Sequence, residues 1–494
     1  MLWMEQERPL DLEIFVTPGL GDSSYLLASG REAVLVDPQR DAWRFLEVAE
    51  ARGWRVRHVL ETHVHNDYLS GAIETRAATG AEIVAPGRGG YEFEHRPADE
   101  GHWLEIGGLR LTAWATPGHT PEHLAWIVTE AGTSGEDPDG ARAIFTGGSL
   151  LVGSVGRTDL LGPVLTNALT ADQQRSLARI ADLPGATSVL PTHGAGSFCS
   201  VGPVSGHRTT TIDAELGANR TFALAGAPAD DFRIQALDGL GRFPDYYAHM
   251  ARINRRGPRV LGRLILPPAL DPAAFEAAAA GGATIVDARD REAFAAGHVR
   301  DSLNIELESA FSGYVGWLVE FGAPILLVLP DAPDALAEAT TELLRVGYER
   351  VPGWLEGGVD AWAASGRPLS SYGTTSMEDV HRRRAADGDP GVLLDVRQAN
   401  EWADGVVPDS ELIFVADLPS RLAELPSGAP VTVFCRTGHR ASMAASVLDS
   451  AGFDVTLVDE GGAANWPGPL ETVPAGAGGG GTGDAARPAD EPSR

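Results

Sequence analysis

Cysteine is scarce in this chain, with two residues in 494. Two cysteines cannot build a disulfide framework, and such low usage is typical of a reducing compartment. The sequence also lacks an apolar run long enough to cross a membrane. Its first residues, Met1–Glu13, mix acids with few apolar side chains and do not resemble a signal peptide. These absences predict a soluble, cytoplasmic protein.

Positive charge is also in short supply. The chain has 39 basic residues against 68 acidic ones, which gives a formal net charge of −29. A field of this sign repels nucleic acids and anionic membranes, so we expect neither as a partner. Hydrophobic residues make up 43% of the chain, enough to build real cores, and the length suggests about three domains.

The chain divides into an N-terminal region, an internal repeat and a tail. Residues 11–256 alternate short apolar runs with turns and end in helix and loop, which is typical of a layered α/β domain with mixed strands. The repeat has a first copy over 257–370 and a second over 374–470. Each copy alternates strands with helices and predicts a mainly parallel sheet covered on both faces. Residues 475–494 are rich in Gly, Ala, Pro and acids, and we expect them to be disordered.

The two copies of the repeat match along their length but differ at one decisive place. A strand-like segment ends at Asp287 in the first copy and at Asp395 in the second, and an arginine follows each aspartate two residues later. After a later apolar run the second copy has Cys435, whereas the first continues with Pro330-Asp331. We therefore expect the first copy to be a catalytically silent scaffold or docking unit.

Cys435 stands between a predicted strand and a predicted helix. The segment after the apolar run Val431–Phe434 reads Cys435-Arg436-Thr437-Gly438-His439-Arg440. A strand-to-helix turn aims backbone N–H groups and a helix N-terminus at the sulfur, and Arg436 and Arg440 add positive charge. Such surroundings favour the thiolate, which is the nucleophile. A buried, inert cysteine is the ordinary alternative.

The repeat resembles the rhodanese fold over both copies, because Cys-x-x-Gly-x-Arg after a strand, with Asp-x-Arg upstream, is a signature of sulfurtransferases. The resemblance implies that Cys435 carries a sulfane sulfur as a persulfide. It also implies catalytic roles for Arg436 and Arg440 and substrate contacts for Gly438 and His439. A tyrosine-phosphatase-like loop, Cys-x5-Arg, is the rival interpretation. Only four residues separate Cys435 from Arg440, however, which leaves less room for a tetrahedral phosphate.

Histidines recur at the ends of predicted strands in the N-terminal domain. One loop carries His63, His65 and Asp67, a second carries His119, and a third carries His193. Because each loop follows an apolar run, we expect the three to meet at one edge of the domain and to form a metal site. For any one of these histidines, a surface or hydrogen-bonding role is the ordinary alternative.

The motifs His-x-His-x-Asp and Gly-His-Thr, with a late His, resemble the metallo-β-lactamase fold, an αββα sandwich. Within that fold, Thr-Pro-Gly-His-Thr and Gly-Arg-Thr-Asp-Leu are similar to persulfide dioxygenases, especially those fused to rhodanese domains. The resemblance implies one Fe(II) held by His63, His119 and an aspartate within the segment 145–148. Position 148 is glycine here, and Tyr68 stands where the family has another histidine. A two-metal site is therefore not expected.

A single metal ion is still expected in the N-terminal domain, with Fe(II) favoured and Zn(II) as the alternative. Arg157 would bind an anionic substrate such as glutathione persulfide, unless it forms only a surface ion pair. Tyr68 would hydrogen-bond a bound ligand, unless it only fills space. The candidate ligands are a three-histidine face with two neighbours: His63, His65, His119, Asp67 and His193.

The leading hypothesis is a persulfide dioxygenase coupled to a rhodanese-type sulfurtransferase. The N-terminal domain would oxidise a small persulfide to sulfite, and Cys435 would pass sulfane sulfur to sulfite or to a thiol. Fusion of the two sites raises the local concentration of a shared intermediate. One alternative is a zinc-dependent thioester hydrolase. Another is a sulfurtransferase with a degenerate N-terminal binding module. A homo-oligomer is left open.

Overall fold

Strands and helices alternate along most of the chain in the computed structural model, which describes residues 10–133, 138–201, 206–308, 310–387 and 391–472. The chain divides into two units. The first contains residues up to Phe243, Tyr247–Ile265 and Leu344–Val346; the second contains Pro244–Tyr246, Leu266–Leu343 and the chain from Gly347 onward. The tail predicted to be disordered, 475–494, lies outside the described residues.

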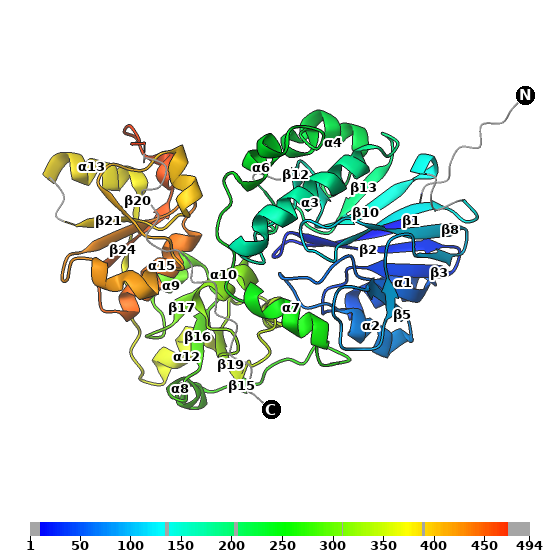
Figure 1. Ribbon diagram of the computed structural model, residues 1–494. Helices are drawn as coiled ribbons and strands as arrows, with labels where there is room; N and C mark the ends of the chain where they lie inside the picture. Colours follow the sequence, from blue (N-terminus) through cyan, green and yellow to red (C-terminus); the bar gives the residue numbers. More distant parts are fainter. Residues whose placement is uncertain (1–9, 134–137, 202–205, 309, 388–390, 473–494) are drawn as a thin grey trace, which may run out of the picture. The chain divides into compact units, whose positions relative to one another are not determined.

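Two six-stranded sheets form the middle of the first unit (Figure 1), in the orders β1-β2-β3-β4-β5-β6 and β14-β13-β10-β9-β8-β7. Along β9, Leu124, Trp126 and Val128 pack between the sheets, whereas Ala125 and Ile127 pack against the outer helices. Successive side chains of a strand point to opposite faces, and here both faces are buried. The strands, with the ribbon β11-β12, are β1 (Asp11–Thr17), β2 (Asp22–Ser29), β3 (Glu32–Val36), β4 (Arg55–Leu60), β5 (Glu82–Pro86), β6 (Arg96–Ala98), β7 (Trp103–Ile106), β8 (Leu109–Ala115), β9 (Leu124–Glu130), β10 (Ala143–Gly147), β11 (Leu150–Leu151), β12 (Ser154–Val155), β13 (Ser188–Pro191) and β14 (Thr210–Thr211).

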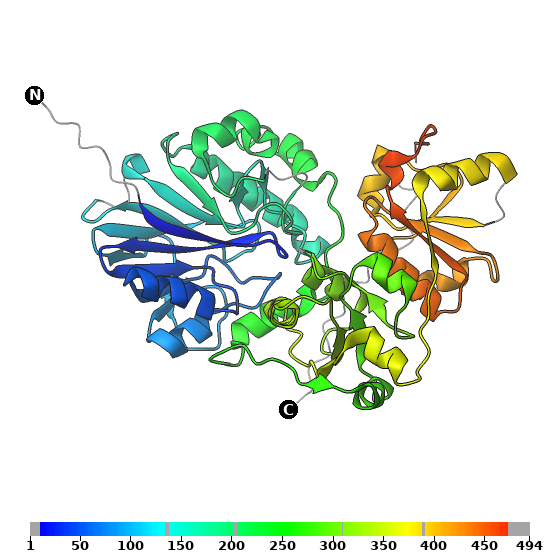
Figure 2. The same cartoon turned by 180° about the vertical axis from the view of Figure 1, so that it is seen from behind.

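Helices cover both outer faces of this pair of sheets (Figures 1 and 2). Phe45 of α1 and Ala72 of α2 pack on the first sheet, and Leu177 of α3 and Phe232 of α6 pack on the second. The predicted αββα sandwich is therefore confirmed. The helices of this unit are α1 (Trp43–Arg52), α2 (Ala72–Thr79), η1 (Pro138–Gly140), α3 (Pro163–Ala181), α4 (Ile212–Ala218), α5 (Arg220–Ala223), α6 (Ala229–Leu237) and α7 (Tyr247–Arg256).

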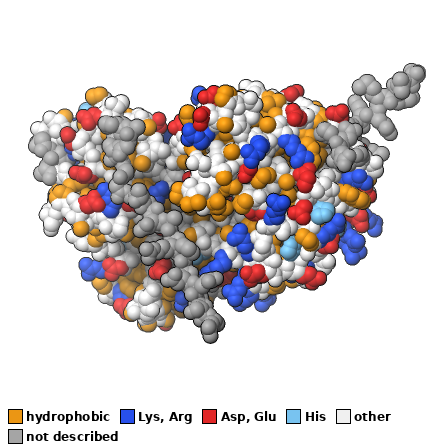
Figure 3. Space-filling model, in the orientation of Figure 1, with side chains coloured by type: hydrophobic (Ala, Val, Ile, Leu, Met, Phe, Trp, Pro, Cys, Tyr) orange, Lys and Arg blue, Asp and Glu red, His pale blue; other side chains and the backbone are white. Residues whose placement is uncertain are grey.

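The surface of the first unit mixes charges of both signs. Figure 3 shows basic and acidic side chains interspersed on the face that it draws, and all the basic ones are arginine because the chain contains no lysine. Ion pairs such as Arg179–Glu100, with a nitrogen–oxygen distance of 2.7 Å, contribute to this mixing. None of the described helices has both the length and the apolar composition that a membrane crossing requires.

The second unit contains the internal repeat as two five-stranded parallel sheets. Their orders are β15-β19-β18-β16-β17 and β20-β24-β23-β21-β22, which is the same arrangement twice. The predicted pair of rhodanese-like parallel sheets is thus confirmed. The strands are β15 (Ala269–Leu270), β16 (Thr284–Asp287), β17 (Leu303–Asn304), β18 (Ile325–Val328), β19 (Gly353–Leu355), β20 (Gly373–Ser376), β21 (Val392–Asp395), β22 (Ser410–Leu412), β23 (Val431–Phe434) and β24 (Val455–Glu460).

Equivalent strands of the two copies lead to different loops. The central strand β18 of the first copy leads to Pro330, whereas its counterpart β23 leads directly into Cys435 and then α15. The helices and helical turns that accompany the two sheets are α8 (Pro272–Ala280), α9 (Arg291–Ala296), α10 (Phe311–Leu318), α11 (Ala335–Arg345), α12 (Gly358–Ala364), α13 (Met377–Asp387), η2 (Ala399–Asp404), α14 (Leu418–Arg421), η3 (Leu422–Glu424), α15 (His439–Ser450) and η4 (Ala463–Asn465).

Candidate functional site

Three histidine-bearing loops of the first unit meet at one edge of the sandwich. His63 follows β4, His119 lies between β8 and β9, and His193 follows β13. The ring centroids of His63 and His119 lie 5.0 Å apart, those of His63 and His193 5.3 Å, and those of His119 and His193 5.2 Å. All three rings are buried, and one nitrogen of each lies within 4.8 Å of the others. The strand-end pattern therefore does bring these residues together.

The hydrogen bonds of these three rings occupy one nitrogen of each and leave the other nitrogen for the centre of the cluster. His119 Nδ1 donates to the carbonyl oxygen of Arg157 at 2.8 Å, and His193 Nδ1 donates to Asp22 Oδ1 at 2.8 Å. The hydroxyl of Thr62 donates to a carboxylate, so it accepts from His63 Nδ1 at 2.8 Å. Each ring thus presents Nε2 to the centre. Anchoring of the second ring nitrogen by a carboxylate or a carbonyl is typical of metal-ligating histidines.

The spacing of two of these nitrogens fits a bound metal ion. The Nε2 atoms of His63 and His193 lie 3.3 Å apart. Two imidazole nitrogens at about 2.0–2.1 Å from one tetrahedral ion are themselves about 3.3 Å apart. The residues present therefore fit a metal ion bound to nitrogen ligands, although this geometry does not distinguish iron from zinc.

The protonation of the three rings is consistent with a cation between them. Burial lowers the pKa of His63, and it lowers the pKa of His119 to about 3, so both rings are neutral. Burial alone would also lower the pKa of His193, but the carboxylates of Asp67 and Asp22 raise it to about 10. The carboxylates of Asp67 and Asp22 thus stabilise a positive charge at the ring of His193, whether it is a proton or a metal ion.

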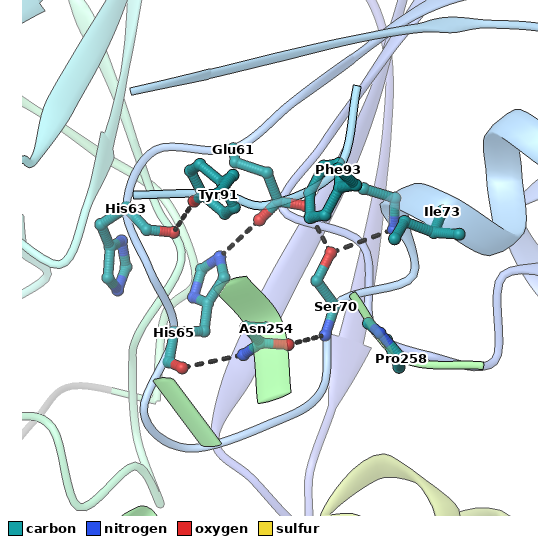
Figure 4. Close-up of a pocket in the computed structure, with 10 residues that line it drawn as sticks. Glu61, His63, His65, Ser70, Ile73, Tyr91, Phe93, Asn254 and Pro258 are labelled. Carbon is teal, nitrogen blue, oxygen red and sulfur yellow. Dashed lines mark hydrogen bonds and ion pairs between the residues drawn. The ribbon is translucent and has the colours of Figure 1, made fainter. Parts of the chain in front are cut away.

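His65 lies beside this group but turns one nitrogen away from it. Its Nε2 atom lies 3.0 Å from the Tyr68 hydroxyl, 3.2 Å from Glu61 Oε2 and 3.4 Å from Asp37 Oδ1. Its Nδ1 atom is buried and has no hydrogen-bond partner among the described residues. Figure 4 shows the ring between Glu61 and His63. This is the nitrogen of His65 that the acids do not bind, and its role as a metal ligand stays a prediction.

A small cavity lies behind His65 (Figure 4). Its volume is about 10 Å³, room for roughly one water molecule. Asn254 of α7 closes this region: its amide donates to the carbonyl oxygens of His65 and Tyr68 at 2.8 Å each, and its Oδ1 atom accepts from the Ser70 N–H at 2.9 Å. A helix far along the chain thus fixes the loop that carries His65.

The glycine at position 148 has a steric explanation. A β-carbon placed on Gly148 would lie 2.2 Å from His119 Cδ2, well inside contact distance. The Gly148 N–H donates to His123 Nε2 at 2.9 Å, and His123 Nδ1 donates to the Thr116 hydroxyl at 2.8 Å. The backbone at 148 therefore binds the ring of His123, and the ring of His119 leaves no room there for a carboxylate side chain.

Two further predicted residues have partners within the protein. Arg157 is 3% exposed, and its Nε and Nη2 atoms each donate to Asp159 at 2.7 Å. Its carbonyl oxygen is the acceptor for His119. Tyr68 is fully buried, and its hydroxyl donates to the carbonyl oxygen of Asp37 at 3.2 Å. Substrate binding by either residue stays a prediction.

The thiol loop of the second unit places one backbone donor at the sulfur. The Gly438 N–H donates to Cys435 Sγ at 3.1 Å, and α15 begins at the next residue. The thiol is only 1% exposed, whereas Arg436 beside it is exposed. Ala463 N–H donates to the Cys435 carbonyl oxygen at 3.1 Å. A helix N-terminus and an N–H group directed at sulfur stabilise negative charge there.

Arg440 fastens this loop to η2. Its guanidinium forms a two-point ion pair with Glu401, with Nη2 2.9 Å from Oε1. Glu401 also accepts from the Gln398 N–H at 3.1 Å. The positive charge of Arg440 therefore lies in the thiol loop and is paired with the carboxylate of Glu401. His439 is half-buried and contacts acids of the first copy.

Several residues of these sites were not predicted from the sequence. Asp37 has the one signal visible in the sequence, because it is an acid directly after the apolar run that forms β3; its φ of 48° is seen only in the structure. The others come together only in the folded chain. They are Asp22, Glu61, His123 and Asn254 in the first unit, and Arg291, Glu306, Glu308 and Glu401 in the second.

Comparison with known families gives matches over both units. The metallo-beta-lactamase superfamily matches residues 17–193, and the rhodanese-like domain matches residues 271–365 and 376–467. These ranges contain the histidine cluster and most of both copies of the repeat.

Named relatives resemble the first unit. Hydroxyacylglutathione hydrolase of Methylobacillus flagellatus is 33% identical over 171 residues, which span 34% of this chain but only 60% of the hydrolase. The enzyme of the same name from Methylobacterium nodulans is 30% identical over 281 residues, 52% of this chain and 95% of the relative. The crystal structure of a metallo-beta-lactamase from Staphylococcus aureus superposes with a TM-score of 0.61 at 26% identity, over 70% of this chain and 99% of that one.

Proposed function

The chain belongs to the metallo-β-lactamase superfamily through its first unit and has two rhodanese-like domains in its second, and from this we propose that it is a sulfur-handling enzyme with two linked sites. Cys435 is the sulfur carrier, and the histidine cluster is the centre of a persulfide dioxygenase. The observation that carries the proposal is the contact between the Gly438 N–H and Cys435 Sγ at 3.1 Å.

Sulfur transfer at Cys435 needs no external oxidant or reductant. The thiolate attacks the sulfane sulfur of a small persulfide, RSSH; the S–S bond to R breaks, RSH leaves, and Cys435 holds the sulfur as a persulfide. Sulfite then attacks the outer sulfur, so that Cys-SSH and SO3²⁻ give Cys-SH and S2O3²⁻. The Gly438 N–H and the N-terminus of α15 stabilise the anionic sulfur in both steps.

The first unit would produce the sulfite. In the overall reaction RSSH, O2 and H2O give RSH, SO3²⁻ and two protons. The Nε2 atoms of His63, His119 and His193 would hold the metal ion. Nitrogen donors of this kind suit both Fe(II) and Zn(II), but only iron would supply the redox chemistry. Asp22 orients the ring of His193 through a 2.8 Å hydrogen bond. Burial of the three rings keeps bulk water away from the nitrogen atoms that would hold the metal ion.

Thioester hydrolysis is the second candidate for the first unit. The named relatives are hydroxyacylglutathione hydrolases, and a metal-activated water is the usual nucleophile of such chemistry. Both candidates use a small thiol derivative of the glutathione type. They differ in whether O2 is consumed.

The deciding experiment uses the full chain loaded anaerobically with Fe(II) or with Zn(II) and checked by elemental analysis. With glutathione persulfide and O2, the iron form is expected to consume O2 and release sulfite, and the His63→Ala variant is expected to lose both. The Cys435→Ser variant is expected to keep sulfite formation and lose thiosulfate.

Three results would contradict parts of this proposal. No O2 uptake above the metal-free control, together with zinc-dependent cleavage of a glutathione thioester, would make the first unit a hydrolase. Unchanged sulfite release by His63→Ala would make it a binding module. Unchanged sulfur transfer by Cys435→Ser would remove the role of the thiol.

A further inference from the structure

An arginine of the first rhodanese-like copy contacts the loop that carries Cys435. Arg291, the first residue of α9, donates from Nη1 to the Thr437 carbonyl oxygen. A β-carbon placed on Gly438 would lie 1.9 Å from this Nη1 atom, and Gly438 has φ of 99°. The backbone conformation therefore favours glycine at 438, and a side chain there would displace the Arg291 guanidinium. Because the Gly438 N–H is the donor to Cys435 Sγ, Arg291 acts on the group that contacts the sulfur.

Glu306 of the same copy holds Arg291 in this position. Its Oε1 atom accepts from the backbone N–H of Arg291 at 2.7 Å and from Nε at 2.8 Å, and its Oε2 atom accepts from Nη2 at 3.1 Å. Three hydrogen bonds to one carboxylate leave the guanidinium little freedom. The side chain of Glu306 is 7% exposed, so the pair is shielded from solvent.

Glu306 also binds the residue that begins α15. His439 Nε2 lies 3.0 Å from Glu306 Oε2 and 2.7 Å from Glu308 Oε2, and His439 Nδ1 lies 3.2 Å from the Thr437 hydroxyl. The hydrogen bond that His439 donates to Glu306 raises the pKa of His439 against the opposing effect of burial. The charge of Glu308 also raises this pKa, and the charge of Arg291 lowers it. A cation at a helix N-terminus is unfavourable by itself, so the two carboxylates compensate for it.

The rest of the first copy packs against the same helix. Asn304 of β17 accepts a hydrogen bond from the Ser442 hydroxyl, and its backbone N–H donates to Ser446 Oγ at 3.1 Å. Trp317 of α10 packs edge-on against Phe414, with ring centroids 4.8 Å apart. α15 thus has a fixed partner in the first copy.

We propose that the copy without a cysteine is a working part of the Cys435 site, in which Arg291 and Glu306 are positioning residues that hold the Thr437–His439 backbone against the sulfur and keep His439 beside two carboxylates. This inference rests on the proposed sulfur transfer at Cys435. It assigns a role in the reaction to a domain that lacks the nucleophile, in place of a silent scaffold.

The test uses the full chain, with thiosulfate as sulfur donor and cyanide as acceptor, so that S2O3²⁻ and CN⁻ give SO3²⁻ and SCN⁻. Arg291→Ala is expected to lower kcat by about tenfold with a smaller change in KM, because loss of a partly buried charged hydrogen bond costs roughly a factor of ten. Arg291→Lys is expected to recover part of this loss. Glu276→Gln is the matched control, because it removes an exposed ion pair with Arg367 elsewhere in the first copy.

Two readouts separate positioning from general stability. Glu306→Gln is expected to move the alkaline limb of the pH profile of kcat/KM to lower pH, together with the imidazole pKa of His439 measured by NMR. Arg291→Ala is expected to slow alkylation of Cys435 by iodoacetamide in protein that is folded by circular dichroism.

The outcomes distinguish this inference from the proposed function. The inference alone would be overturned if Arg291→Ala and Glu306→Gln both kept the kcat, pH profile and alkylation rate of the wild type while Cys435→Ser was inactive. If the Cys435→Ser variant transferred sulfur as fast as the wild type, both this inference and the proposed function would be overturned.

Discussion

His63 Nε2 and His193 Nε2 face each other across 3.3 Å in the first unit, and each ring is fixed from behind through Nδ1. A proton or a metal ion between the two nitrogens satisfies both of them. His193 and His63 thus face the same point, although the two are separated by 130 positions in the sequence.

His193→Ala is expected to lower the affinity for a divalent metal by more than the Asp22→Asn variant does, because it removes a ligand rather than the group that orients one. For Asp22→Asn the loss should be about 10–100-fold, as is usual when the partner of a metal-ligating histidine is removed. Elemental analysis and calorimetric titration of the metal-free protein with Zn(II) measure both effects. His102→Ala, at an exposed position of the same unit, should bind as wild type. Equal affinity in His193→Ala and wild type would exclude His193 as a ligand.

Gly148→Asp is expected to damage the centre rather than to supply a carboxylate. The new β-carbon would meet His119 Cδ2 at 2.2 Å, so the ring must move. Overpacking of this kind costs about 1–3 kcal/mol in stability, and displacement of a ligand lowers metal affinity as well. Thermal unfolding and metal content would show both losses. Gly226→Asp is the control, since a side chain there meets nothing within 4 Å. Tighter metal binding in Gly148→Asp would contradict the steric explanation.

The fold was predictable from the sequence because its signals are local. Short apolar runs end at turn residues, and the segments around Asp287 and Asp395 repeat with similar spacing, so two equivalent parallel sheets could be expected. The histidines of the first unit were predictable for the same reason: each follows a strand, and strand ends of one sandwich edge meet.

The supporting residues were not predictable, because their partners are distant in the sequence. Asn254 reaches His65 from a helix 189 positions away, and Arg291 reaches Thr437 across 146 positions. No short motif contains either pair. The orientation of His65 was also beyond the sequence, since which of its nitrogens faces the cluster depends on Glu61 and Asp37.

The ion pair between His439 and Glu306 makes stability depend on pH. Although burial alone raises it, hydrogen bonds from His439 and Arg291 lower the pKa of Glu306 to about 2, from an ordinary value of 4.5. The contribution of Glu306 to the free energy of unfolding is therefore present above pH 4.5 and is lost as pH falls toward 2. The pKa of His439 is raised. Its contribution to the free energy of unfolding is therefore complete below pH 6.5 and is lost as pH rises through the raised pKa.

Both contributions are complete only between pH 4.5 and 6.5. The difference in unfolding free energy between the wild type and Glu306→Gln should be largest in this window and smaller at pH 9. Urea unfolding of the full chain, followed by a probe of the second unit, measures it. For the control Glu276→Gln, the difference in unfolding free energy from the wild type should not peak between pH 4.5 and 6.5. A flat difference for Glu306→Gln from pH 4 to 9 would mean that His439 and Glu306 do not stabilise each other.

Arg440→Lys is expected to impair sulfur transfer although the charge is kept. Arg440 binds Glu401 through two nitrogens, and lysine has a single ammonium group that cannot reproduce this fork. The loop would lose its attachment to η2, and the Gly438 N–H would be held less well against Cys435 Sγ. A decrease in kcat of about tenfold, corresponding to about 1.4 kcal/mol, is expected in the thiosulfate–cyanide assay. Glu401→Gln should lower kcat by a similar factor, and the double variant should lose less than the product of the two, because both remove the same contact. Strictly multiplicative losses would show that Arg440 acts on the substrate independently of Glu401.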